Sequence, residues 1–121
     1  MKLMTLVFGA SMNPARYSNI AMRMLKEYGH PIQAIGGREN EFEGTKIQIG
    51  HPELEGVDTI TMYMGASRQA EHEDYLLSLN PRRIIFNPGA ENYSLASKAK
   101  AQGIEVLEAC TLVMLRTGQY A

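Results

Sequence analysis

Two features of the chain predict an α/β fold in three layers. Short apolar runs typical of buried strands alternate along the sequence with segments of helical periodicity. Turns of small residues follow three of these runs, at Gly9-Ala10-Ser11, Gly65-Ala66-Ser67 and Asn87-Pro88-Gly89. The carboxyl ends of parallel strands share one edge of a sheet, so the three turns should gather there. The prediction is a Rossmann-like sandwich with a mostly parallel sheet of about five strands.

The first β-α-β unit lies at the start of the chain. Leu3 to Phe8 is apolar nearly throughout, which is typical of a central strand covered on both faces. Apolar residues recur at helical spacing from Ser18 onward, and Gly29 and Pro31 end that helix. Ile32 to Ile35 is the second strand. A right-handed crossover should therefore join two parallel strands.

The same alternation continues to the end of the chain. Further strands are predicted at Thr59 to Met64, Arg83 to Phe86 and Val106-Leu107, with a minor strand at Lys46 to Ile49.

Three further helices are expected. Ser67 is the predicted N-cap of a helix that stops before Asn80-Pro81, and the carboxylate-rich run Glu71 to Asp74 should form a solvated face of it. The next helix runs through Leu95 and Ala99 to Gly103. The run from Cys110 to Arg116 favours a short helix, although a strand fits it equally well.

Composition excludes several classes of protein. The 121 residues suit a single domain spanning 1–121, and 45% apolar with 21% charged residues is the composition of a globular protein. A net charge of −1 favours neither a nucleic-acid nor a membrane partner. No signal peptide or membrane-spanning run is evident, which predicts a cytoplasmic protein. The lone cysteine, Cys110, can form neither an internal disulfide nor a zinc site by itself, so no metal site is expected.

The turn after the first strand has the character of an anion site. Gly9 gives the backbone freedom to turn, and the following helix N-terminus offers unpaired N–H groups and a positive dipole end. Ser11, Arg16 and Ser18 could add side-chain donors. In the alternative interpretation, Gly9 only lets strand and helix pack closely, and Ser18 is an ordinary N-cap.

The loop after the second strand also bears on the ligand. Dinucleotide-binding folds that take NAD usually carry an acidic residue near this point, whereas the first charged residue here is Arg38. An arginine suits a phosphate on the adenosine ribose, as in coenzyme A (CoA) or NADP. The alternative is a solvated arginine paired with Glu39 or Glu41.

A resemblance to a known family makes these expectations specific. The pattern G-A-S-x-N-P-x-R-x-S at residues 9–18, together with Asn87-Pro88-Gly89-Ala90-Glu91-Asn92, resembles the stand-alone CoA-binding proteins related to the N-terminal domain of the succinyl-CoA synthetase α subunit. The likeness extends from Leu3 to about Arg116. It implies phosphate contacts at Gly9, Ala10, Ser11, Asn13, Pro14, Arg16 and Ser18, a 3′-phosphoadenosine end near Gly36, Gly37 and Arg38, and a pantetheine path bordered by Gly65, Ser67, Asn87, Pro88 and Gly89.

The sequence carries no recognisable catalytic motif. His30, His51 and His72 fall in predicted turns or on a helix face, and Cys110 in its apolar segment is more often a core residue than a nucleophile. A small protein that binds CoA or acyl-CoA, without catalysis of its own, is therefore favoured. An NAD(P)-binding oxidoreductase or sensor is the first alternative. A subunit that docks on a partner and has lost its ligand is the second, and a homo-oligomer stays open.

Overall fold

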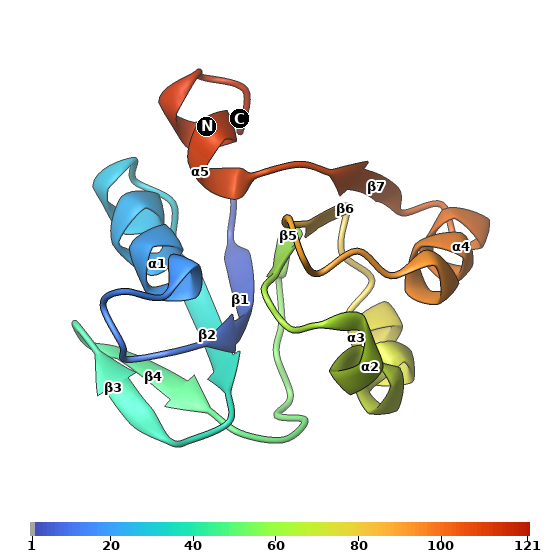
Figure 1. Ribbon diagram of the computed structural model, residues 1–121, viewed down its shortest axis with the longest axis horizontal. Helices are drawn as coiled ribbons and strands as arrows, with labels where there is room; N and C mark the ends of the chain where they lie inside the picture. Colours follow the sequence, from blue (N-terminus) through green and yellow to red (C-terminus); the bar gives the residue numbers. More distant parts are fainter. Residues whose placement is uncertain (1) are drawn as a thin grey trace.

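A seven-stranded sheet organises the computed structural model, which describes residues 2–121 (Figure 1). The strand order is β3-β4-β2-β1-β5-β6-β7, and every pairing is parallel except that of β3 with β4. The strands are β1 (Thr5–Ala10), β2 (Ile32–Gly36), β3 (Asn40–Phe42), β4 (Thr45–Gln48), β5 (Thr59–Met62), β6 (Arg83–Phe86) and β7 (Glu105–Glu108). The predicted α/β fold and mostly parallel sheet are confirmed, with seven strands instead of about five.

Helices cover both faces of the sheet. They are α1 (Tyr17–Glu27), α2 (Ala66–Gln69), the 3₁₀ turn η1 (Ala70–His72), α3 (Glu73–Ser78), α4 (Tyr93–Ala101) and α5 (Thr111–Arg116). Figure 1 shows α1 and α5 on one side of the sheet and α2, α3 and α4 on the other. Two separate buried clusters fill the space between the layers, one under each set of helices. None of the helices within residues 2–121 is long and apolar enough to cross a membrane.

Strand β1 is the centre of the sheet, as its apolar sequence predicts. It pairs in parallel with β2 on one side and with β5 on the other. Val7 packs into the cluster under α1 and α5, while Leu6 and Phe8 pack into the cluster under α3 and α4. All three side chains are fully buried, and each stabilises the fold by roughly 1.5–3 kcal/mol. A strand buried on both faces needs apolar residues at consecutive positions, which removes the alternation of a half-exposed strand.

The additional strand beyond those predicted from sequence belongs to a hairpin at the edge of the sheet. β3 and β4 pair in antiparallel register around the two-residue turn Glu43-Gly44, where both residues have positive φ angles of 46° and 84°. Phe42 is buried in the core and anchors the hairpin, and Lys26 Nζ donates to Glu43 O at 2.6 Å. The sequence predicts a loop here instead of a strand, because glycine and charged residues dominate residues 36–44. Two-residue hairpin turns with positive φ at both positions usually have the sequence Asn-Gly or Asp-Gly, and this turn has neither.

Two helix starts differ from the prediction. Helix α1 begins at Tyr17 with Arg16 as its N-cap, so Ser18 lies inside the first turn and is buried. Ser67 is not an N-cap: Gly65 precedes α2, and no side chain caps that helix. The single helix expected after Ser67 is also broken into α2, η1 and α3. The favoured helix after Cys110 is confirmed as α5.

Glu73 corrects the expectation of a solvated acidic face. Its carboxylate is buried and accepts hydrogen bonds from Asn92 Nδ2 at 3.1 Å and from Lys98 Nζ at 2.9 Å. Asn92 also caps α4, where its Oδ1 accepts from the backbone N–H of Leu95 at 3.2 Å. Glu73 thus ties α3 to the start of α4. Burial alone would raise the pKa of Glu73, but the donors from Lys98 and Asn92 outweigh it and lower the pKa below its ordinary value.

The variant Glu73→Gln should lose stability in a pH-dependent way. A carboxyl group whose pKa is lower in the folded state stabilises the fold above its unfolded pKa, and the contribution disappears as the pH falls through the folded value. At pH 7 we expect a loss of about 1–3 kcal/mol, because the bonds to the ionised group are weakened. Urea unfolding at pH 7 and near pH 3 measures the difference from the parent, which should shrink in acid. The control is Glu53→Gln, at an exposed position. If the loss of stability in Glu73→Gln is the same at both pH values, Glu73 does not stabilise the fold as a buried carboxylate.

Candidate functional site

Two glycines let three strands converge at the carboxyl edge of the sheet. Gly9 has a φ of +98°, and a Cβ atom on it would lie 3.1 Å from backbone atoms of both Tyr63 and Met64. A Cβ atom on Gly36 would lie 2.3 Å from the carbonyl oxygen of Ala10. Only residues without side chains therefore fit where the end of β1 approaches β2 and β5. Gly9 and Gly36 therefore allow the ends of the three strands to pack closely against one another.

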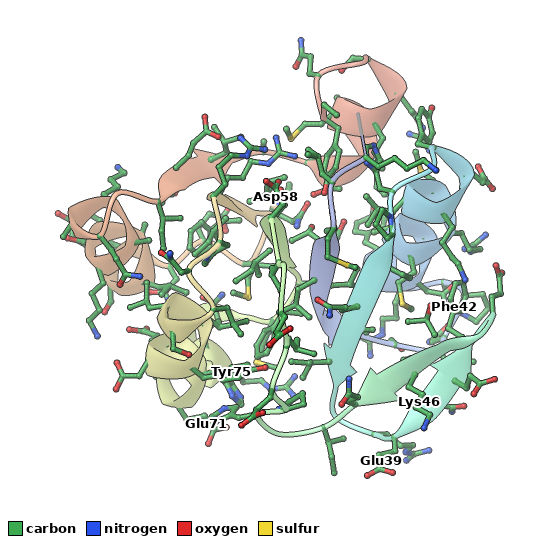
Figure 2. The ribbon with its side chains drawn as sticks, turned by 180° about the vertical axis from the view of Figure 1, so that it is seen from behind. Glu39, Phe42, Lys46, Asp58, Glu71 and Tyr75 are labelled. Carbon is green, nitrogen blue, oxygen red and sulfur yellow. The ribbon has the colours of Figure 1, made fainter. Side chains whose placement is uncertain are left out.

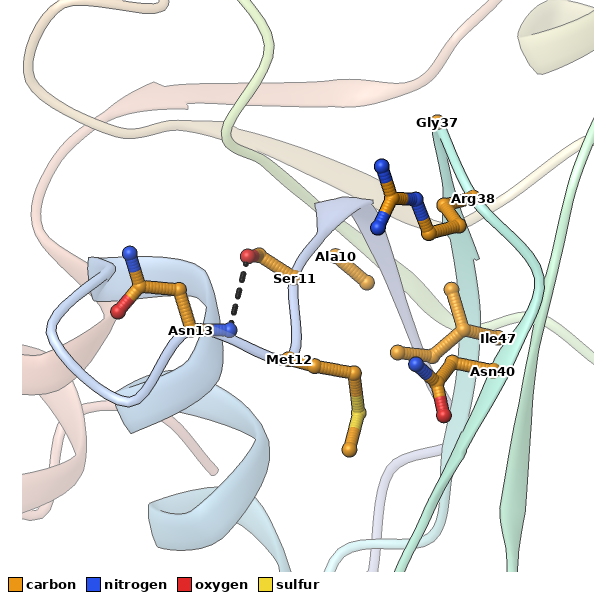
Figure 3. Close-up of a pocket in the computed structure, with 8 residues that line it drawn as sticks. All are labelled: Ala10, Ser11, Met12, Asn13, Gly37, Arg38, Asn40 and Ile47. Atoms are coloured by element: carbon orange, nitrogen blue, oxygen red, sulfur yellow. Dashed lines mark hydrogen bonds between the residues drawn. The ribbon is translucent and has the colours of Figure 1, made fainter.

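Side chains of the loop between β1 and α1 hold that loop in shape. The backbone N–H of Asn13 donates to Ser11 Oγ at 3.1 Å, as Figure 3 shows, and the N–H of Ala15 donates to Asn13 Oδ1 at 3.0 Å. Asn19 Nδ2 donates to Ser11 O at 2.9 Å. The side chains of Ser11 and Asn13, both predicted to bind phosphate, thus accept hydrogen bonds from the backbone of their own loop. The hydroxyl hydrogen of Ser11 is still able to donate outward.

A cavity of about 460 Å³ opens between this loop and the β3–β4 hairpin, and we call it the hairpin cavity. In Figure 3 the side chains of Met12 and Ile47 form an apolar part of its wall, and the guanidinium of Arg38 lies near the end of β1. The lining residues are Ala10, Ser11, Met12, Asn13, Gly37, Arg38, Asn40 and Ile47. The mixture of an apolar wall, an amide and a guanidinium suits a base with a charged sugar phosphate.

A second, more polar cavity adjoins the first, and we call it the arginine cavity. Its volume is about 200 Å³, and it shares Ala10, Ser11 and Gly37 with the hairpin cavity. The lining residues are Gly9, Ala10, Ser11, Arg16, Gly37, Tyr63, Met64 and Arg68. The two cavities therefore adjoin along the ends of β1, β2 and β5, and together we call them the depression. No carboxylate lines either of them.

Three arginines without ion-pair partners in residues 2–121 line this depression. Arg16, Arg38 and Arg68 are exposed, and none forms an ion pair or a side-chain hydrogen bond with another residue of 2–121. Helix α1 has no acidic residue in its first turn, so the positive end of its dipole is not neutralised there. At the amino end of β5, by contrast, Arg82 is paired with Asp58 at 2.9 Å; Figure 2 shows Asp58 far from the hairpin. Free guanidinium groups beside a helix N-terminus favour phosphate.

A third cavity, of about 400 Å³, lies on the α1 and α5 side, and we call it the apolar cavity. Its lining residues are Tyr17, Ile20, Tyr63, Asn87, Pro88, Cys110, Leu112, Val113 and Arg116. Asn87 is buried and its amide is occupied: Nδ2 donates to Thr61 Oγ1 at 2.8 Å, and Oδ1 accepts from the N–H of Thr111 at 2.9 Å. Tyr63 lines both this cavity and the arginine cavity, and burial raises the pKa of its hydroxyl, so the phenol stays neutral.

The predicted site residues divide into two groups. Seven of them line the hairpin and arginine cavities, and two more line the apolar cavity: Gly9, Ala10, Ser11, Asn13, Arg16, Gly37 and Arg38, then Asn87 and Pro88. The others line none of the three: Pro14, Ser18, Gly36, Gly65, Ser67 and Gly89. Gly36 contributes indirectly, because its lack of a side chain leaves space for the carbonyl oxygen of Ala10.

Sequence reasoning missed several residues that complete the cavities: Met12, Asn40, Ile47, Tyr63, Met64 and Arg68. Arg68 could have been found, because it follows the Gly65-Ala66-Ser67 turn that the sequence brings to the carboxyl edge. Asn40 and Ile47 could not, since they reach the site only through the unpredicted hairpin.

The histidines lie outside these cavities. His30 is buried before β2, where its Nδ1 accepts from the backbone N–H of Leu3 at 3.0 Å. His51, expected to be a simple surface turn residue, is exposed but stacks on Tyr75, and its Nε2 lies 2.8 Å from Nδ1 of the half-buried His72. In the described part of the chain, no group of three His, Cys, Asp or Glu residues could hold a metal ion.

The seven-stranded sheet, its two helical layers and the depression at its carboxyl edge define a Rossmann-like α/β protein. Comparison with known families makes the assignment specific: the family model described as a CoA binding domain matches residues 4–116. The chain belongs to this CoA-binding domain family.

Solved structures share the fold over nearly the whole chain. An uncharacterized protein is 40% identical, with a TM-score of 0.96 and 99% of each chain covered. A protein from Thermus thermophilus is 21% identical, with a TM-score of 0.87 over 98% of this chain and 91% of that one. The dinucleotide-forming acetyl-coenzyme A synthetase 1 of Ca. Korarchaeum cryptofilum is 20% identical, with a TM-score of 0.70 over 88% of this chain and 25% of its own. No curated protein matches the chain significantly.

Proposed function

We propose that this protein binds CoA or an acyl-CoA along the carboxyl edge of its sheet, and that it holds the ligand without catalysing a reaction by itself. One observation carries the proposal: the hairpin and arginine cavities adjoin, and three unpaired arginines surround them. Membership of the CoA-binding domain family supports CoA as the ligand. A cytoplasmic location is part of the same proposal, in keeping with the free thiol of Cys110.

The pyrophosphate of CoA is assigned to the arginine cavity. Arg16 and Arg68 both line this cavity, and they come from elements on opposite faces of the sheet: Arg16 precedes α1, and Arg68 lies within α2. Gly9, Ala10 and Ser11 all line this cavity, so the turn after β1 would lie beside the pyrophosphate. A guanidinium can hold two phosphate oxygens with parallel N–H bonds, which favours a pyrophosphate over a single carboxylate.

The 3′-phosphoadenosine end is assigned to the hairpin cavity. Met12 and Ile47 give the adenine ring an apolar surface, and Arg38 supplies a positive charge for the 3′-phosphate. NADP has a ribose phosphate too, so Arg38 alone does not choose between the two ligands. The family membership and the apolar cavity beyond Tyr63 favour CoA, whose pantetheine arm is far less polar than a nicotinamide riboside.

Calorimetric titration of CoA, dephospho-CoA, NADP and NAD tests the proposal and the role of Arg38 together. We expect CoA to bind most tightly. In the Arg38→Ala variant, the difference in affinity between CoA and dephospho-CoA should become smaller. The contact is partly exposed, so a loss of about 1 kcal/mol, or roughly fivefold in affinity for CoA, is expected. Dephospho-CoA lacks the phosphate, so its affinity should hardly change.

Lys46→Ala is the matched control, because Lys46 is a cation on the same hairpin that does not line the hairpin cavity (Figure 2). If the difference in affinity between CoA and dephospho-CoA is the same in Arg38→Ala as in the parent protein, a residue other than Arg38 binds the 3′-phosphate. If none of the four nucleotides binds at millimolar concentration, the proposal fails, and the partner-docking alternative takes its place.

A further inference from the structure

We propose that the apolar cavity receives the acyl end of the ligand, so that the protein prefers thioesters of short aliphatic acids to free CoA. This inference rests on the proposed function, because it needs the phosphates of the same ligand in the arginine cavity. It adds the class of the acyl group and the residues that select it.

The apolar cavity and the arginine cavity share a lining residue. Tyr63, directly after β5, lines both. A ligand anchored by its phosphates beside Gly9 therefore has one neighbouring hollow on the hairpin side and another across Tyr63. A molecule with an anionic middle, a base at one end and an apolar arm at the other matches this order.

The lining of the apolar cavity is mostly aliphatic and aromatic. Ile20, Leu112 and Val113 contribute aliphatic groups, and Pro88 and the ring of Tyr63 add further apolar surface. The polar groups of Asn87 face the protein, where they bond to Thr61 and Thr111. The cavity thus offers a short acyl chain a mostly apolar surface, and Arg116 is the charged residue that lines it.

Two of the side chains that line the apolar cavity are largely exposed. Tyr17 is 69% exposed and Val113 is 51% exposed, and both line it. Covering these two side chains with an alkyl chain would remove apolar surface of protein and ligand from water together. A cavity of about 400 Å³ has to take the end of the pantetheine arm as well, so the acyl chain it admits is short.

An affinity series of CoA, acetyl-CoA, butyryl-CoA and succinyl-CoA tests the inference by calorimetry. Each buried methylene should improve affinity about threefold to fourfold, so butyryl-CoA should bind on the order of tenfold more tightly than acetyl-CoA. Succinyl-CoA, which carries a carboxylate on a chain of the same length, should bind less tightly than butyryl-CoA.

Two tyrosines give a matched pair of variants. Tyr17 and Tyr93 are each the first residue of a helix and each highly exposed, at 69% and 89%, but only Tyr17 lines the apolar cavity. Tyr17→Ala should reduce the ratio of butyryl-CoA to CoA affinity at least threefold, and Tyr93→Ala should leave that ratio unchanged. Val113→Asp should reduce the ratio further, because it puts a charge beside the chain. Val113 is exposed, so this variant should fold.

The outcomes separate the inference from the function beneath it. If CoA binds but butyryl-CoA gains nothing, the inference is overturned and the proposed function stands. If succinyl-CoA binds most tightly, the aliphatic preference is wrong and Arg116, at the same cavity, becomes the selecting group. If Tyr17→Ala changes the oligomeric state in size-exclusion chromatography and not the affinity ratio, a second copy of the chain covers this surface, which also overturns the inference. Failure of every thioester and of CoA overturns both.

Discussion

Gly36→Ala is expected to destabilise the protein by about 2–4 kcal/mol, which is a large effect for one added methyl group. The new Cβ atom would lie 2.3 Å from the carbonyl oxygen of Ala10, on the central strand. Neither atom belongs to a flexible side chain, so relief requires the ends of β1 and β2 to move apart. That movement loosens Ile35 and Ala10, both buried beside it, and costs packing as well as strain.

The neighbouring residue supplies the control. A Cβ atom on Gly37 meets nothing within 4 Å, and its φ lies outside the positive region, so Gly37→Ala should be neutral or stabilising by up to about 1 kcal/mol. Thermal unfolding without ligand measures both variants. We expect Gly36→Ala to lower Tm by roughly 10 °C and Gly37→Ala to leave it within a few degrees. Equal Tm values for the two variants would show that β1 and β2 can separate freely at this edge.

Removing both arginines of the arginine cavity should nearly abolish ligand binding. A charge-assisted bond to a phosphate contributes more than a neutral one, but both guanidinium groups are exposed and partly screened. For Arg16→Ala combined with Arg68→Ala we expect a loss of about 2–3 kcal/mol, or roughly 30- to 150-fold in affinity for CoA. The loss should be larger at low salt, where charge pairing is least screened.

Stability without ligand should hardly change in this double variant, since neither arginine forms an ion pair within residues 2–121. The control is Lys2→Ala combined with Lys100→Ala, which removes the same charge at exposed positions outside the arginine cavity. Titration of CoA into both double variants, at two salt concentrations, separates the loss of specific phosphate contacts from the effect of a lower net charge. If both double variants lose affinity equally, only the overall charge matters, and if neither does, the phosphates lie elsewhere. The single variant Arg16→Ala should lose severalfold by the same argument.

The central strand and the first β-α-β unit could be predicted from sequence because burial on both faces leaves a local trace. Leu6, Val7 and Phe8 are consecutive and apolar, which is typical of a parallel strand covered on both faces. The turn at Gly9 was predictable for the same reason, since a glycine between a buried strand and a helix marks a backbone conformation that other residues avoid.

Other features have no local trace. The hairpin turn Glu43-Gly44 lacks the usual turn residues, so its pairing depends on Phe42 reaching the core. Glu73 looks like any acidic residue in a first helical turn, and only its meeting with Asn92 and Lys98 makes it a buried anchor. Such partners come from elements far apart in the chain, and no periodicity within one segment records them.

The sequence by itself determined which strand lies at the centre, which turns reach the carboxyl edge and that an arginine follows the second strand. The tertiary structure decided which of these residues meet in one place. It removed Ser18 from the exposed surface by starting α1 one residue earlier, brought Arg68 beside Arg16, and set the apolar cavity behind Tyr63. The physical reason is that propensity and hydrophobic pattern act along the chain, whereas a cavity is defined by the packing of several elements at once.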